Sequence, residues 1–267
     1  MLRKIWVITA SLVIISGMIS ATGSAAKQRT YVVALATTSG GFVPFDYNFT
    51  RLPMFVIYSD GQMIATSQIT TQQYPGPALP TLMTKNVNFD MQRIVKALDA
   101  AKLTDPKFDW GMPPVADVPN TEVLTQLSAN KRISRVSVFA LGMTGPGLKK
   151  SQVKYRLKAS RLLDDLQGFS NKYIWSKSMQ AAWTPKKYLY QVRAAEPTEY
   201  SNTLDWVGET LTKDSKCAVL GTTDSAKITK LGAQINQETL WNSEGKTWRV
   251  NLRPLLPHET GCKSIGY

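Results

Sequence analysis

The sequence contains one arrangement of residues that could support nucleophilic catalysis. Residues 151–154 read SQVK, which puts a serine three positions before a lysine near the start of an expected helix. In penicillin-binding proteins and β-lactamases, a lysine at that spacing helps to remove the serine hydroxyl proton. Their companion motifs are absent here: the S-x-N of residues 128–130 comes before the serine, and Lys246-Thr247 is followed by tryptophan instead of glycine.

A secreted serine-type hydrolase using Ser151 and Lys154 is therefore the alternative hypothesis. The simpler interpretation makes Ser151 the N-cap of the helix. The single histidine, His258, cannot build a multi-histidine metal site, and its setting between Pro257 and Glu259 is typical of a solvated loop. The adjacent Asp164 and Asp165 point in different directions on a helix, which is poor geometry for a glycosidase pair. We expect no cofactor and no metal, and a non-catalytic function more than an enzyme.

Positive charge is concentrated in one part of the sequence. Between Lys149 and Arg193 there are eleven basic residues and only two acidic ones. Lys154, Lys158 and Arg161 recur at helical spacing beside the apolar stripe of a helix expected over 151–166. The sequence therefore predicts an anion-binding surface formed by Lys150, Lys154, Lys158 and Arg161. A solvated face with no partner is the competing interpretation.

The N-terminus is typical of a secretory signal peptide. Arg3 and Lys4 precede an apolar run over residues 5–19, and small residues follow up to Ala26. We expect cleavage after Ala25 or Ala26, because the run is shorter than the roughly 20 residues of a membrane-spanning helix. An uncleaved anchor is the alternative. The expected location is secreted, or loosely associated with the cell envelope.

Export changes which partners the basic residues can have. Without the leader, 30 basic and 19 acidic residues remain, a net charge of +11. Outside the cytoplasm the available polyanions are anionic cell-wall polymers and lipid headgroups, and no nucleic acid is expected. An inhibitor of an extracellular enzyme remains a third possibility, and the sequence does not indicate the oligomeric state.

Cysteine use agrees with an oxidising compartment. The chain has two cysteines, Cys217 and Cys262, and this sparse, even number predicts one disulfide. Two free, buried thiols are the alternative, because cysteine is also a common core residue.

Residue patterns predict an α+β fold in which antiparallel sheets built from hairpins are covered by amphipathic helices. The Asp60-Gly61 pair joins two β-branched and aromatic runs, and a two-residue turn there needs positive φ at both positions. Two further hairpins are expected over 121–141 and 239–253, and further strands near 31–36, 81–84, 188–193 and 217–220. Helices are expected over 89–103, 151–166 and 223–235.

Three segments are expected: the signal peptide at 1–26, an α+β domain at 27–170, and a smaller module with the disulfide at 171–267. Five tryptophans occur in this C-terminal module, at positions 175, 183, 206, 241 and 248. We expect them mainly in its core, because large aromatic side chains dominate small cores. If exposed, they could stack on sugars.

Three strings carry a resemblance to a known group of proteins. They are GGFVP at residues 40–44, RLPMF with IYSDG at residues 51–61, and RPLLP at residues 253–257 ahead of Cys262. In these strings the chain resembles uncharacterised exported proteins of actinobacteria, over most of the mature length. The first two hairpins and their helix are also similar to a widespread bacterial domain of unknown function. The resemblance implies export and this fold, and it implies no activity, substrate or catalytic residue.

Overall fold

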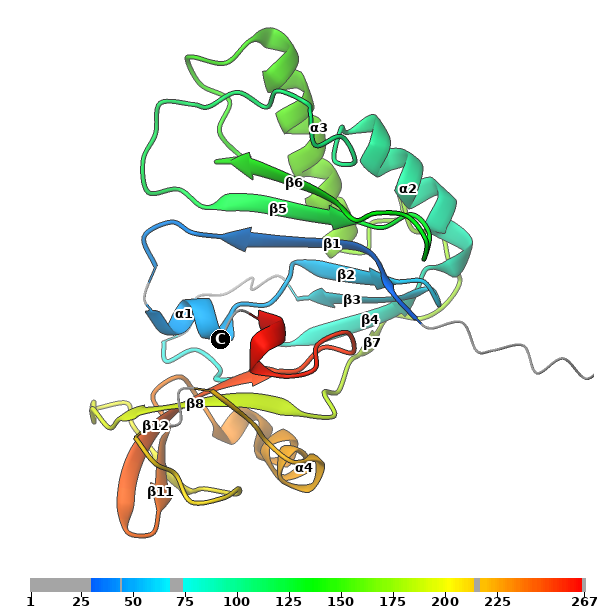
Figure 1. The fold of residues 1–267 in the computed structure, drawn as a ribbon. Coiled ribbons are helices and arrows are strands. Elements are labelled where there is room, and N and C mark those ends of the chain that lie inside the picture. The colour runs from blue at the N-terminus through cyan, green and yellow to red at the C-terminus, as the bar shows by residue number, and fades with distance from the viewer. Residues whose placement is uncertain (1–29, 44, 68–73, 214–216, 266–267) are drawn as a thin grey trace, which may run out of the picture.

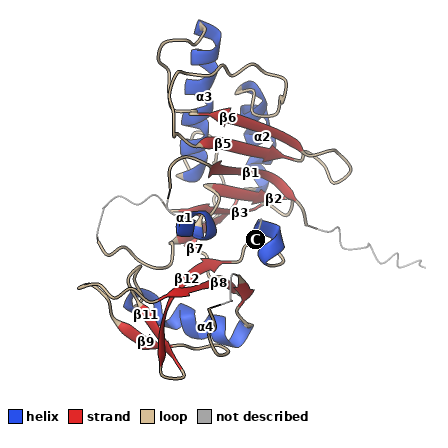
Figure 2. Ribbon diagram, turned by 60° about the vertical axis from the view of Figure 1, so that its left-hand side comes forward, coloured by secondary structure: helices blue, strands red, loops and turns tan. Residues whose placement is uncertain are grey.

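The computed structural model describes residues 30–43, 45–67, 74–213 and 217–265, so the expected signal peptide lies outside the described residues. Two β-sheets organise this part of the chain, one of seven strands and one of five. Figure 2 shows them one above the other, with helices beside each. The α+β class expected from the sequence is confirmed.

All pairs in the seven-stranded sheet are antiparallel, and the strand order is β6-β5-β1-β2-β3-β4-β7. The strands are β1 (Val32–Ser39), β2 (Phe55–Tyr58), β3 (Gln62–Thr66), β4 (Leu82–Asn86), β5 (Asn120–Thr125), β6 (Ser134–Phe139) and β7 (Ala181–Ala182). The hairpins β2-β3 and β5-β6 lie on either side of β1. The first strand of the described chain therefore lies inside the sheet, between the two hairpins. Of the seven strands, only the two-residue strand β7 was not predicted from the sequence.

Helices α2 (Met91–Ala100) and α3 (Lys150–Gln167) cover one face of this sheet (Figure 1). Strand residues with period 2, including Ala34, Ala36 and Val123, share a buried core with Leu98 of α2 and Leu162 of α3. On the opposite face, Leu35, Tyr58 and Ile64 form a separate cluster with Leu256 from the C-terminal segment. The sheet is thus covered by helices on one side and only partly covered on the other.

The turn between β2 and β3 lies where the sequence predicted it, but its type differs from the prediction. Gly61 has φ 87°, as expected, but Asp60 is not among the residues with positive φ. The Gly61 N–H donates to the Tyr58 carbonyl at 3.0 Å, so the loop is three residues long with glycine in the left-handed position. The turn in which both residues do have positive φ joins β11 to β12: Glu244 has φ 51° and Gly245 φ 73°.

The five-stranded sheet has the order β10-β8-β12-β11-β9. Its elements are β8 (Tyr188–Ala194), β9 (Thr203–Asp205), β10 (Ala218–Val219), β11 (Leu240–Ser243) and β12 (Lys246–Pro254), with α4 (Thr222–Leu231). Strand β9, which the sequence did not indicate, pairs parallel with β11, so the sheet is mixed. Short 3-10 turns lie at η1 (Asn88–Asp90), η2 (Gly232–Gln234) and η3 (Cys262–Ile265), and a short helix α1 at Phe45–Thr50.

Aromatic side chains fill the core of the second sheet, as expected. Trp241 is fully buried and packs edge-to-face on Trp206, which in turn contacts Tyr190. Two of the five tryptophans lie outside this core: Trp175 is 68% exposed, and Trp183 packs against the cluster that contains Leu256 on the first sheet. The division at residue 170 stays a prediction; Ile174, just beyond it, packs in the core of the first sheet.

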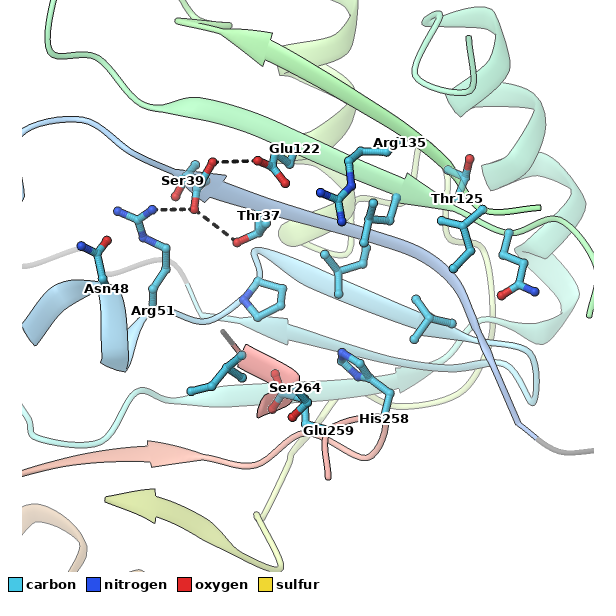
Figure 3. A pocket seen from close by; sticks show the side chains of 18 of the residues that line it. Thr37, Ser39, Asn48, Arg51, Glu122, Thr125, Arg135, His258, Glu259 and Ser264 are labelled. Carbon is cyan, nitrogen blue, oxygen red and sulfur yellow. Dashed lines mark hydrogen bonds between the residues drawn. The ribbon is translucent and has the colours of Figure 1, made fainter. Parts of the chain in front are cut away.

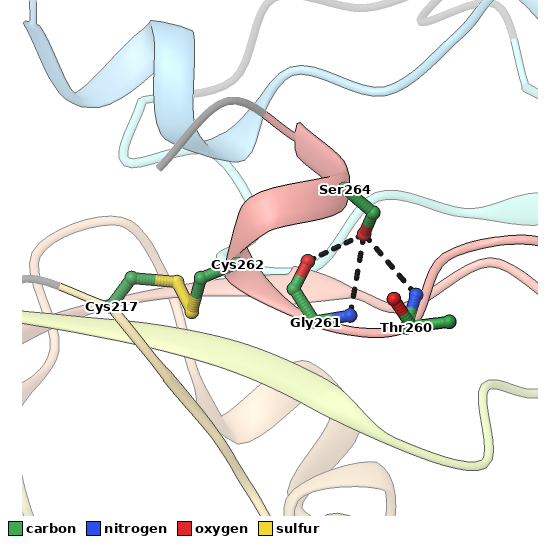
Figure 4. Close-up of a disulfide and its surroundings, with 5 residues drawn as sticks. All are labelled: Cys217, Thr260, Gly261, Cys262 and Ser264. Carbon is green, nitrogen blue, oxygen red and sulfur yellow. Dashed lines mark hydrogen bonds between the residues drawn. A yellow bond between two sulfur atoms is a disulfide. The ribbon is translucent and has the colours of Figure 1, made fainter.

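The C-terminal segment returns from the second sheet to the first. Arg253 and Glu259, both buried, form a two-pronged ion pair with distances of 2.7 and 2.6 Å, and Arg253 also donates to the Arg51 carbonyl. The predicted disulfide between Cys217 and Cys262 is confirmed, with 6.0 Å between the Cα atoms (Figure 4). It ties η3 to the start of β10, so the segment is fixed at both ends.

Candidate functional site

The structure places all four predicted anion-binding residues on one exposed face of α3. Lys150, Lys154 and Lys158 are four positions apart, Arg161 follows three later, and each side chain is exposed. Positions three and four apart on a helix lie one above the other, so the four charges form a single row. We call Lys150, Lys154, Lys158 and Arg161 the basic face.

Helix α3 begins two residues earlier than it would if Ser151 were its N-cap. The N-cap is Lys149, in extended conformation, and its backbone N–H donates to the Gln152 side chain at 2.8 Å. Ser151 is therefore inside the first turn, and its expected role as N-cap is wrong. The capping comes instead from a glutamine reaching back from the third helical position, half of a capping box.

The opposite side of α3 is held by a buried arginine. Arg156 is 0% exposed, and its guanidinium donates to the carbonyl oxygens of Trp110, Phe139 and Met143 at 2.6 to 3.0 Å, and also to that of Ala140. Burial lowers the pKa of Arg156. These bonds satisfy carbonyls of the loops beside β6 and fix the rotation of α3, which keeps the basic face outward.

Among the residues that the structure describes, none of the basic-face side chains forms an ion pair, because the nearby acidic residues pair with other lysines. Asp165 lies one turn after Arg161, but its carboxylate pairs with Lys172 at 3.4 Å. Asp109 pairs with Lys149 at 3.7 Å. The four charges of the face are therefore available to an external anion.

The positions of Ser151 and Lys154 do not support the hydrolase hypothesis. Ser151 and Lys154 are both exposed, and in the described chain no hydrogen bond joins the hydroxyl to the amine. The Lys154 ammonium lies 5.8 Å from the centre of the Tyr155 ring, and neither Ser151 nor Lys154 lines either of the two clefts described below. An activated nucleophile needs a base held against it in a site that excludes water.

A cleft of about 630 Å³ lies on the partly covered face of the seven-stranded sheet, and the sequence did not indicate it. Its apolar side is formed by Val32, Leu35, Leu124 and Ile133. Pairing of β1 with β5 and of β5 with β6 sets Leu35, Leu124 and Arg135 in one row. The opposite wall is the C-terminal segment, with His258 and Glu259 (Figure 3).

Polar groups gather at one end of this cleft. Arg51 donates to the Thr38 carbonyl at 2.8 Å, and its guanidinium lies 4.7 Å from the centre of the Tyr47 ring. Ser39 donates to Glu122 at 3.0 Å on the neighbouring strand. Figure 3 shows these groups around the mouth of the cleft, with Arg135 nearby. Such an apolar floor with a few polar groups is the usual form of a small-molecule site.

His258 is exposed, as expected for a loop histidine, but one of its ring nitrogens has a hydrogen-bond partner. Its Nδ1 lies 2.8 Å from the hydroxyl of Tyr58, a residue that is 2% exposed. Burial raises the pKa of Tyr58 and lowers that of His258. Both groups are thus favoured in their neutral forms, and either the tyrosine hydroxyl or the imidazole can be the donor of this hydrogen bond.

The cleft holds no assembled nucleophile and base within the described residues. Ser264 lines it, but its Oγ accepts from the N–H groups of Thr260 and Gly261 and donates to the Gly261 carbonyl (Figure 4). In the part of the chain that the structure describes, no group of three His, Cys, Asp or Glu side chains could hold a metal ion. The arrangement can bind and orient a molecule.

Comparison with family models, with curated proteins and with solved structures finds no match to this chain. The resemblance to exported actinobacterial proteins therefore stays an expectation. Among the described helices, none has both the length and the apolar character needed to cross a membrane. The disulfide is consistent with an oxidising, extracytoplasmic location.

Proposed function

We propose that this is an exported, non-catalytic protein that binds an anionic component of the cell envelope through the basic face of α3. The observation that carries the proposal is the row formed by Lys150, Lys154, Lys158 and Arg161, exposed on one side of a helix and without ion pairs among the described residues. A row of unpaired like charges raises the energy of the protein alone and is relieved when an anion binds.

The length of the row favours a polymer over a small anion. Eleven residues of α-helix rise about 16 Å, at 1.5 Å per residue. A single phosphate or carboxylate can contact two of these side chains at most, whereas a chain of repeating anionic groups can contact all four. A polymer or a lipid surface of repeated phosphates or carboxylates therefore fits this geometry.

The experiment measures binding to purified wall polymer bearing repeated phosphates and, separately, to vesicles containing an anionic phospholipid. The triple variant Lys150→Gln, Lys154→Gln, Lys158→Gln should bind about a hundredfold more weakly, at about 1 kcal/mol for each cation near an anionic surface. The wild-type affinity should also fall steeply with salt.

The matched control is Lys186→Gln, Lys187→Gln, Lys230→Gln, three exposed lysines outside the basic face. Both triple variants lower the net charge equally. A loss of binding in the α3 variant alone therefore supports binding through the basic face. Equal loss in both would show that overall charge is responsible, and unchanged binding in the α3 variant would exclude the face. The polymer and vesicle arms separate a wall polymer from a lipid headgroup.

A further inference from the structure

Two exposed aromatic side chains border a cleft at the edge of the seven-stranded sheet. Phe89 is 92% exposed and Trp175 is 68% exposed, and both line a cavity of about 660 Å³. Phe89 lies in η1, just before α2, and Trp175 lies in the segment after α3. Large aromatic residues are normally buried or partnered, so two of them at one opening mark a binding surface.

Buried contacts hold Trp175 in place. Asp90, only 4% exposed, accepts the backbone N–H groups of Trp175 and Ser176 at 2.9 and 2.8 Å. The guanidinium carbon of Arg93 lies 3.1 Å from the centre of the indole, and its buried Nη1 has no hydrogen-bond acceptor among the described residues. The ring itself therefore serves as the partner of Arg93. A platform fixed in this way loses little entropy when it binds a ligand.

Uncharged polar groups surround the two rings. The Ser178 hydroxyl donates to the Asn86 carbonyl at 2.7 Å and lies 2.9 Å from the Ser176 hydroxyl. The side-chain oxygen of Asn86 accepts the Asn88 N–H at 3.0 Å, which leaves the amide N–H groups of Asn86 as donors. Lys177 adds one positive charge, and the Asp90 carboxylate is engaged with the backbone.

We propose that this cleft binds a β-linked chain of pyranose sugars with equatorial substituents, one ring stacking on Trp175 and a neighbouring ring on Phe89. Such sugars present a flat face of C–H groups to an aromatic ring and hydroxyl or acetamido groups at their edge. Amide and hydroxyl groups around the aromatics match that edge. A protein partner would need apolar neighbours around the two rings, and the lining residues beyond the rings are polar.

This site is independent of the basic face, so the two proposals fail separately. Stacking and neutral hydrogen bonds persist at high salt, whereas binding of a polyanion to α3 weakens. A neutral oligosaccharide tests the aromatic cleft without engaging Lys154 or its neighbours.

The probes are cellohexaose and the hexamer of β-1,4-linked N-acetylglucosamine, each titrated by calorimetry at low and high salt, with the indole N–H signal of Trp175 followed by NMR. Binding of at least one hexamer should be nearly salt-independent and should shift that signal. Trp175→Ala and Phe89→Ala should each weaken it about fivefold, the change that about 1 kcal/mol of aromatic contact gives. Comparison of the two hexamers distinguishes a plain glucan from an acetamido sugar.

Phe42→Ala is the matched control, because Phe42 is 94% exposed and does not line the cleft. Trp175→Phe keeps an aromatic ring and should retain most of the affinity. This variant therefore separates loss of stacking from a folding defect in Trp175→Ala. The proposal is overturned if neither hexamer binds, or if binding survives both alanine substitutions. It is also overturned if the protein self-associates and Phe89→Ala makes it monomeric, because the rings would then form a protein interface.

Discussion

Arg156 lies within the basic stretch of the sequence, yet its role is opposite to that of its neighbours. Lys154 and Lys158 face solvent, while Arg156 is fully buried and donates to carbonyls at the end of β6, in the loop after it and in the loop before β5. No carboxylate partner is needed because the planar guanidinium offers five donors to aligned acceptors. Charge alone in a sequence therefore does not tell a binding residue from a structural one.

His258 carries a prediction at the same scale. Because burial disfavours the charged imidazole, the His258 pKa lies below its ordinary value of 6.5. The folded state then binds fewer protons than the unfolded state as pH falls. The stability that this neutral histidine contributes is full above pH 6.5 and is lost as pH falls below it through the folded pKa.

NMR titration of the ring protons measures this directly, since the chain has a single histidine. The wild-type midpoint should lie below 6.5. Tyr58→Phe should shift it, upward if the hydroxyl donates to Nδ1 and downward if it accepts from Nδ1–H. Tyr190→Phe, which leaves the His258 contact in place, should not change it. A wild-type midpoint at or above 6.5 would contradict the geometry.

At the scale of elements, the hairpin turns show how local chemistry and packing combine. Gly61 and Gly245 both have positive φ, 87° and 73°, so a side chain at either position is strained. They differ in surroundings. An added Cβ at Gly61 would lie 2.6 Å from the Asn88 Cβ, whereas at Gly245 nothing lies within 4 Å.

Alanine substitution at the two glycines should therefore separate backbone strain from steric contact. Gly245→Ala should lower the free energy of unfolding by about 1 to 2 kcal/mol, the cost of left-handed backbone alone. Gly61→Ala should cost more, by about 1 to 3 kcal/mol for the added overpacking against η1. Chemical denaturation of both variants tests this; equal losses would mean that η1 moves aside freely.

For the whole molecule, the C-terminal segment connects the two sheets. It leaves β12, forms the Arg253–Glu259 pair, contributes Leu256 to the cluster on the first sheet and ends at η3. It also forms a wall of the cleft that contains His258. The disulfide that holds η3 to β10 thus fixes one wall of the cleft as well as stabilising the fold.

Replacing both cysteines, Cys217→Ser with Cys262→Ser, should lower the free energy of unfolding by about 4 kcal/mol, as the chain-entropy relation gives for a loop of this length. The sequence separation is 45 residues. Limited proteolysis should then cut first near η3, and the His258 midpoint should move toward 6.5 as the wall loosens. Unchanged stability would show that the ion pair and Leu256 suffice.

Local patterns predicted a large part of the fold. Period-2 runs around Asp60-Gly61 and before Lys246 gave two hairpins, and period-3.6 apolar spacing gave α2, α3 and α4 within a few residues. The basic face was also predicted, because helical periodicity alone determines which residues share a face. The disulfide was predicted from only two premises, the count of two cysteines and the expectation of export.

Tertiary structure decided what depends on pairing between distant segments. The sequence determined an α+β chain with one disulfide and a row of basic residues on α3, and it predicted a signal peptide that lies outside the described residues. It did not determine that β1 lies between two hairpins, that Tyr58 meets His258 across 200 residues, or that Phe89 and Trp175 border one cleft. Local periodicity reports which side of an element is apolar, whereas long-range contacts arise from how sheets and loops pack together, and no local pattern encodes that choice.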